Sequence, residues 1–158
     1  RDVLEGTVGM DAKLDKIEME MGARPYSQTL ARLREAGLRP TRQRLALGRL
    51  LFEGGDQHVT AERLHEQAQG AGVSVSLATV YNTLHQFTDA KLLREVVVDS
   101  SRTYFDTNVS DHHHFFHEEE GRLMDIDGAK IEVSGLPDAP AGTGVSRVDI
   151  VIRVRASD

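Results

Sequence analysis

The apolar residues between positions 27 and 87 recur at intervals of three and four, and short polar segments interrupt them. This spacing is typical of helices that bury one face, and it predicts four helices in this stretch. The side chains expected to cap their N-termini are Ser27, Thr41, Thr60 and Ser76. In the last helix we expect an apolar face of Leu77, Val80, Leu84 and Phe87, with Thr79, Asn82, Thr83 and Gln86 facing elsewhere.

The pattern changes to alternation after residue 93. Residues 94–98 and 102–106 predict two strands joined by a polar turn at 99–101. Helices that include a helix–turn–helix and are followed by such a hairpin have the element order of a winged-helix domain.

The remainder predicts a small α/β domain. We expect strands over residues 115–117, 123–126 and 148–154, and a helical stretch that begins near Gly128. The predicted fold class is therefore α+β: an N-terminal arm over residues 1–23, a winged-helix domain over 24–107, and an α/β domain over 108–158.

The composition excludes several classes of protein and of functional site. The 158 residues include no Cys, which excludes disulfides, thiolate zinc sites and Cys nucleophiles. No apolar run approaches the ~20 residues that span a bilayer. No signal-peptide pattern opens the chain, and we expect a cytoplasmic protein that does not contact membranes.

The net charge of −6 conceals an asymmetry between two segments. Residues 24–52 hold seven Arg against one Glu, whereas residues 105–138 hold nine acids against two bases. Arginine binds phosphate oxygens bidentately, so the first segment suits a polyanion. The helix over 76–88 offers uncharged donors and acceptors of the kind that read A·T base pairs in the major groove. A solvated basic face with no ligand is the alternative.

The segment 111–117 is the densest chemical signal, with four His in six residues followed by three Glu. In a strand, His112 and His114 share one face, while Asp111 and His113 share the other. Imidazole with carboxylate suits Zn²⁺, Fe²⁺, Mn²⁺ or Ni²⁺, and neutral imidazole also ligates haem iron. A polar loop with a chance His run is the alternative. No metalloprotease, esterase, P-loop or dinucleotide motif occurs, so we do not expect an enzyme.

These features together resemble the ferric uptake regulator family. The matching motifs are AGLRPTRQR at 36–44, HVTAE at 58–62, ATVY at 78–81 and the run DHHHFFH at 111–117. The resemblance covers about residues 25–158. It implies a bacterial, homodimeric winged-helix repressor whose C-terminal domain dimerises and whose hinge binds a divalent metal.

The resemblance also implies site residues. The hinge metal site falls on His58, Asp106, His112, His114 and Asp125. A second, less closely matched site falls on Asp111, His113, Glu132 and Asp149. The DNA-binding residues expected from the charge pattern, the predicted helix and the resemblance are Arg39, Arg42, Thr79, Tyr81, Asn82 and Thr83. Arg39 falls where the family inserts a basic residue into the minor groove.

Two departures from the family pattern change the expectation. His117 and Glu120 stand where many relatives have the first Cys pair of a structural zinc site, so we expect no such zinc. Asn82 follows Tyr81 where many relatives have Arg. With the triple-His motif, these departures resemble the haem-responsive iron response regulator branch, in which His112, His113 and His114 are the haem candidates.

The sequence therefore predicts a dimeric regulator of iron and haem homeostasis that binds A·T-rich palindromic double-stranded DNA. Its predicted effector is Fe²⁺ or Mn²⁺, with Zn²⁺ able to substitute in vitro, or haem. The alternative is a metal-buffering or metal-dependent protein that does not bind DNA.

Overall fold

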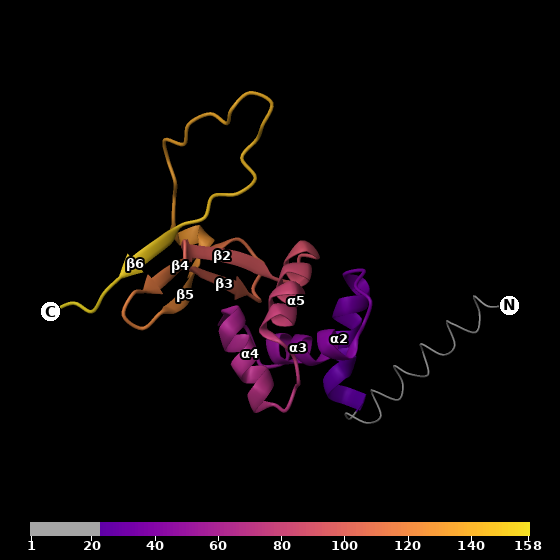
Figure 1. Cartoon of the computed structure of the whole chain (residues 1–158). Coiled ribbons are helices and arrows are strands. Elements are labelled where there is room, and N and C mark those ends of the chain that lie inside the picture. Colours follow the sequence, from indigo (N-terminus) through magenta and orange to yellow (C-terminus); the bar gives the residue numbers. More distant parts are fainter. Residues whose placement is uncertain (1–22) are drawn as a thin grey trace. The chain divides into compact units, whose positions relative to one another are not determined.

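The computed structural model describes residues 23–158, with side chains from Ser27 onward (Figure 1). Residues 1–22 of the predicted N-terminal arm lie outside the described residues. The described residues divide into two compact units, with the boundary between Val109 and Ser110.

The first unit combines helices with a small antiparallel sheet. Its elements in chain order are α2 (Ala23–Glu35), α3 (Arg42–Phe52), β1 (His58–Val59), α4 (Ala61–Gly70), α5 (Leu77–Asp89), β2 (Arg94–Asp99) and β3 (Arg102–Asp106). The sheet order is β1-β3-β2. Helices α4 and α5 form the predicted helix–turn–helix, and β2 with β3 forms the wing.

Three of the four predicted N-caps are confirmed. Thr41, Thr60 and Ser76 each accept a hydrogen bond from the backbone N–H three residues later, at the starts of α3, α4 and α5. The prediction for Ser27 is wrong, because α2 already includes Ala23 and Ser27 is an exposed interior position. Two residues after the end of α2, Gly37 has a φ of 75°, a conformation that favours glycine and that turns the chain out of the helix.

The core of the first unit is built from the apolar faces of these helices and the inner side of the sheet. In α5, Val80, Leu84 and Phe87 are fully buried as predicted. Leu77 is 36% exposed and Thr83 only 4%, so the expected face is wrong at both positions. Each lies about 60° from Val80 around the helix, on opposite sides, and the buried stripe extends toward Thr83.

The wing turn is stabilised by one carboxylate. Asp99 accepts hydrogen bonds from Arg102 and from the backbone and hydroxyl of Ser101. These donors, Arg102 first, hold the pKa of the Asp99 carboxyl well below its usual range. The turn that the sequence predicts at 99–101 is thus locally encoded.

The second unit contains a mixed sheet of order β5-β4-β6. Its strands are β4 (His112–His117), β5 (Arg122–Asp127) and β6 (Val151–Val154), with a 3₁₀ turn, η1 (Gly128–Lys130), after β5. Strand β4 pairs antiparallel with β5 and parallel with β6. The predicted helix near Gly128 is wrong, because only the single turn forms before the irregular segment 131–150. Strand β6 begins at Val151, three residues later than predicted.

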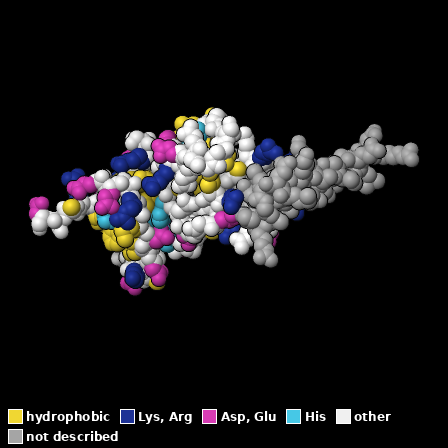
Figure 2. Space-filling model, turned by 90° about the horizontal axis from the view of Figure 1, so that it is seen from below, with side chains coloured by type: hydrophobic (Ala, Val, Ile, Leu, Met, Phe, Trp, Pro, Cys, Tyr) yellow, Lys and Arg dark blue, Asp and Glu magenta, His cyan; other side chains and the backbone are white. Residues whose placement is uncertain are grey.

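Burial alternates along β4, as its period of two requires. His112, His114 and Phe116 are buried on one face. On the other face Phe115 lies between Met124 of β5 and Ile152 of β6, and all three are exposed. A cavity of about 510 Å³ lies beside Phe115, Met124 and Val154. Figure 2 shows hydrophobic side chains reaching the surface among charged ones.

Within residues 23–158, no helix combines the length and the apolar character needed to cross a membrane.

The burial difference within α5 gives a first prediction. Leu84→Ala removes a fully buried side chain and should lower the free energy of unfolding by about 2–5 kcal/mol. Leu77→Ala, at the exposed end of the predicted face, should change it by less than about 1 kcal/mol. Urea denaturation followed by circular dichroism measures both, and equal losses would contradict this assignment of the buried face.

Candidate functional site

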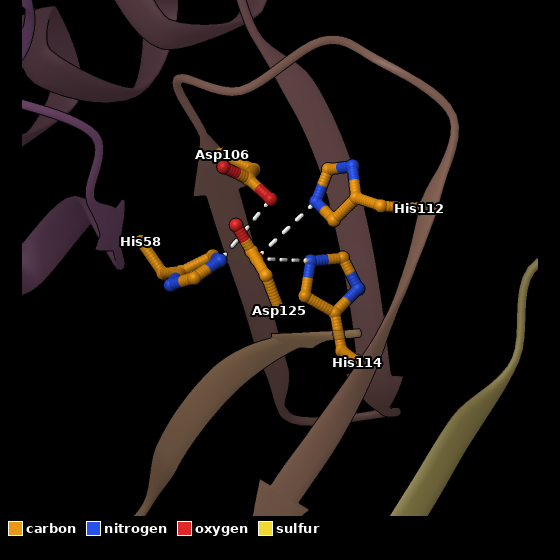
Figure 3. Close-up of side chains that lie close together, drawn as sticks. All are labelled: His58, Asp106, His112, His114 and Asp125. Atoms are coloured by element: carbon orange, nitrogen blue, oxygen red, sulfur yellow. Dashed lines mark ion pairs between the residues drawn. The ribbon is translucent and has the colours of Figure 1, made fainter. Parts of the chain in front are cut away.

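A histidine and a carboxylate from different elements meet in the first unit. His58 of β1 is the register partner of Asp106 at the end of β3. Its Nε2 lies 3.1 Å from Asp106 Oδ2 (Figure 3). Asp106 is fully buried, and its Oδ1 accepts a hydrogen bond of 2.9 Å from the backbone N–H of Asn108. A buried carboxylate that keeps its charge requires such donors or a cation.

Two further histidines and a carboxylate converge in the second unit. His112 and His114 lie on the buried face of β4, and Asp125 of β5 is the register partner of His114. Both Nε2 atoms point at Asp125 Oδ1, at 3.3 Å from His112 and 3.4 Å from His114 (Figure 3). The two imidazole rings are 4.5 Å apart between centroids. The potential ligand atoms of these three side chains lie within 4.8 Å of one another.

The second nitrogen of His112 determines what its Nε2 can do. His112 Nδ1 lies 2.6 Å from the carbonyl oxygen of Ser110. A carbonyl only accepts, so Nδ1 must carry the proton, and in the neutral ring Nε2 carries the lone pair. That lone pair faces a carboxylate oxygen, which is also an acceptor. The contact is favourable only when a proton or a metal cation lies between them.

This donor set fits a divalent transition metal. A histidine that donates Nδ1–H to a carbonyl and directs Nε2 inward has the arrangement typical of ligating histidines. Imidazole with carboxylate oxygen and no thiolate suits Fe²⁺, Mn²⁺ and Zn²⁺. His112 and His114 are also nearly fully buried, and bound metal would relieve the electrostatic cost of placing Asp125 against them.

The residues of the second expected site do not converge. In the described part of the chain, Asp111, His113, Glu132 and Asp149 form no cluster of ligand atoms. His113 Nδ1 accepts a 3.2 Å hydrogen bond from the backbone N–H of Ile150, and Asp149 pairs with Arg147 at 2.8 Å. Asp111 and Glu132 are exposed.

The expected DNA-contacting residues are mostly at the surface of the first unit. Arg39, Arg42, Tyr81 and Asn82 are exposed, and Thr79 is half-buried with its hydroxyl accepting from Ser76. Thr83 is the exception, since it faces the core. Its expected direct contact with bases is not compatible with this burial.

Several contacts around α5 were not predicted from the sequence. Tyr81 donates a 2.6 Å hydrogen bond from its hydroxyl to Glu62 of α4. This bond lowers the pKa of the Glu62 carboxyl and raises the pKa of the Tyr81 hydroxyl. Arg44 of α3 donates two hydrogen bonds to the Gln86 side chain.

Two further histidines, one on α4 and one on α5, have partners within the first unit. His65 Nε2 donates to the carbonyl of Val75 at 3.0 Å. The His85 ring contacts Tyr81 and Phe105. The contact with Phe105 joins α5 to β3, so spacing along the chain gives no signal for it, whereas Tyr81 and His85 lie one turn apart on α5.

The first unit has a helix–turn–helix, a wing and an arginine-rich preceding segment, and imidazole and carboxylate groups lie close together in each unit. These features are typical of a metal-responsive winged-helix DNA-binding protein. The comparisons with known proteins agree. The model of the ferric uptake regulator family matches residues 35–152, and the chain belongs to this family.

Named relatives and solved structures are consistent with that assignment. The chain is 33% identical over 117 residues to a peroxide-responsive repressor, PerR, of Staphylococcus epidermidis, with 74% of each chain covered. It resembles the structure of the ferric uptake regulator from Pseudomonas aeruginosa with manganese, at 27% identity and a TM-score of 0.64, covering 82% of this chain and 98% of that one. The Vibrio cholerae ferric uptake regulator, at 22% identity, a TM-score of 0.62 and coverage of 80% and 98%, shares the fold.

These findings confirm the α+β fold class and the expectation that the chain is not an enzyme. The chain is a metal-responsive transcription regulator of a family whose members bind DNA and act as dimers.

The hydrogen bonds of the neighbouring histidines predict different protonation of the same ring nitrogen. Nδ1 of His112 should carry a proton, because it donates to Ser110, whereas Nδ1 of His113 should be unprotonated, because it accepts from Ile150. Long-range ¹H–¹⁵N NMR of the chelator-treated protein distinguishes the two. A His112 ring with unprotonated Nδ1 would contradict the orientation on which the metal fit depends.

Proposed function

We propose that the chain is a dimeric repressor that binds DNA when one divalent ion is held by His58, Asp106, His112, His114 and Asp125. The ion is Fe²⁺ or Mn²⁺ in this proposal, and iron status is the signal. The observation that carries it is the approach of the His112 lone pair to a carboxylate oxygen, which calls for a cation at that point.

The proposed ligands explain how an ion would control shape. His58 and Asp106 belong to the first unit, and the other three ligands belong to the second. An ion shared by both sets would favour the inter-domain arrangements in which all five can reach it. A ligand shifts an equilibrium only by its differential affinity for the two states, and a shared ion supplies that difference.

The DNA-binding mode follows from the helix–turn–helix. We propose that α5 enters the major groove and presents Tyr81 and Asn82 to base edges, while Arg39 and Arg42 contact the backbone or minor groove. A dimer with two-fold symmetry requires a palindromic operator, with its half-sites about one helical turn or a multiple apart. The uncharged donors on α5 favour an A·T-rich sequence. The apolar strip Phe115, Met124 and Ile152 supports dimerisation through the second unit.

Haem is the second candidate effector, and the triple-His motif is the observation that favours it. The haem candidates are His112, His113 and His114, and ligation by His112 or His114 would remove that residue from the divalent site. Metal would then promote DNA binding and haem would oppose it.

The metal prediction is tested by fluorescence anisotropy on a labelled A·T-rich palindromic duplex. Chelation should abolish specific binding, and Mn²⁺ should restore it. His112→Ala should raise the Mn²⁺ concentration needed for DNA binding by about 10-fold or more. Mutating a residue that only supports a metal ligand typically lowers metal affinity by roughly 10- to 100-fold, and loss of a ligand itself should cost at least as much. His117→Ala, on the opposite face of β4, is the matched control and should leave that concentration unchanged.

Two other outcomes of the same titration would contradict the metal prediction. Binding that survives chelation and collapses with haem, together with a Soret shift lost in His112→Ala, would replace the divalent ion by haem as the effector. Binding by His112→Ala with an unchanged Mn²⁺ requirement would reject the proposed site.

The DNA contacts are tested by salt dependence. Each phosphate neutralised contributes about 0.9 to the slope of log K against log salt. Arg39→Ala and Arg42→Ala should each weaken binding and lower this slope by about 1. Arg122→Ala, which removes an exposed partner of Glu120 in the second unit, should leave the slope unchanged. No binding by the metal-loaded protein, or salt-independent binding, would favour a metal buffer that does not act on DNA.

A further inference from the structure

The aromatic side chain on the proposed DNA-reading helix is held at its hydroxyl by the neighbouring helix. Tyr81 of α5 is 38% exposed, and its hydroxyl lies 2.6 Å from Glu62 Oε1 of α4. Glu62 is itself exposed. The hydrogen bond therefore spans the two helices of the helix–turn–helix at their surface.

The ring of Tyr81 has a second contact. It stacks on His85, one turn further along α5, with centroids 6.5 Å apart and planes inclined by 21°. The His85 ring in turn meets Phe105 of β3 edge-on, with centroids 5.7 Å apart at 80°. A side chain with few torsions, bonded at its tip and packed along its ring, has little freedom left to adopt other rotamers.

A carboxylate at this surface needs an explanation, because the first unit is proposed to approach a polyanion. A negative charge near the groove repels phosphates and lowers affinity. Glu62 also lies in the first turn of α4, where an acid stabilises the helix terminus. That role alone does not require a hydrogen bond to Tyr81.

We propose that Glu62 is a positioning residue for DNA recognition, which holds the Tyr81 hydroxyl so that the ring rather than the hydroxyl is presented to bases. The inference rests on the proposed function, in which α5 enters the major groove. With its donor occupied, Tyr81 contributes apolar ring surface, and the apolar feature of the major groove is the thymine 5-methyl group. The charge of Glu62 thereby lowers the affinity for DNA, while its hydrogen bond to Tyr81 increases discrimination between bases.

The experiment compares two duplexes that differ only in that methyl group. One is the A·T-rich palindrome, and the other carries deoxyuridine in place of every thymine. The metal-loaded full-length protein and its variants are titrated with both by anisotropy, and the ratio of the two dissociation constants is the readout. A general loss of stability would weaken binding to both duplexes and leave the ratio unchanged.

The variants separate the hydrogen bond from the charge. Glu62→Gln retains an acceptor for the hydroxyl and should keep the wild-type preference for thymine. Glu62→Ala removes the acceptor and should reduce the preference at least about fivefold, a coupling within the usual range for contacting residues. Glu66→Ala removes another exposed acid of α4 and should leave the preference unchanged.

A double-mutant cycle tests whether Glu62 acts through Tyr81. In a Tyr81→Phe background there is no hydroxyl to hold, so adding Glu62→Ala should produce no further change in the ratio. If the wild type binds and Glu62→Ala keeps the wild-type ratio, or shifts it equally in the Tyr81→Phe background, the positioning role is rejected and DNA binding stands. If the wild type prefers neither duplex, ring recognition of the methyl group is rejected. If the metal-loaded wild type binds neither duplex, the proposed function fails and the inference fails with it.

Discussion

A buried lone pair cannot face a carboxylate oxygen favourably unless a positive charge lies between them, and the proposed metal centre depends on this constraint. The period of two in β4 places His112 and His114 on the same buried face, and pairing with β5 brings Asp125 against them. The hydrogen bond from His112 to Ser110 then fixes which nitrogen points at the carboxylate. Strand pairing, burial and tautomer together create a set of ligands that metal binding would satisfy.

The first unit also contains a carboxylate next to a histidine, but there the carboxylate is the buried group and protein donors compensate its charge. Asp106 is buried at the end of β3, and it is compensated by His58 from the neighbouring strand and by a backbone N–H. The adjacent residue on that strand, Phe105, packs in the core and meets the His85 ring, which stacks on Tyr81. One strand therefore borders both the histidine–carboxylate pair and side chains of α5, the helix proposed to read DNA.

The proposed DNA-binding surface combines positive charge, which attracts phosphates, with side chains that hydrogen bonds hold in place. In this proposal, arginines of the first unit would supply electrostatic affinity that depends on salt, whereas α5 carries uncharged side chains suited to base edges. The hydrogen bonds from Arg44 to Gln86 and from Tyr81 to Glu62 fix long side chains before DNA arrives. Such preorganisation lowers the entropic cost of ordering them on binding.

The sequence by itself determined the features that depend on neighbours in the chain. Three helix caps and the wing turn follow from local hydrogen bonding, and the family motifs indicated the ligand candidates. The strand expected over residues 115–117 begins three residues earlier, at His112, in the structure. Only the tertiary structure decided that Thr83 is buried and Leu77 exposed, that Asp125 faces His112, and that Glu62 reaches Tyr81. These outcomes depend on how separate elements pack, and periodicity within one element carries no information about the partner that covers it.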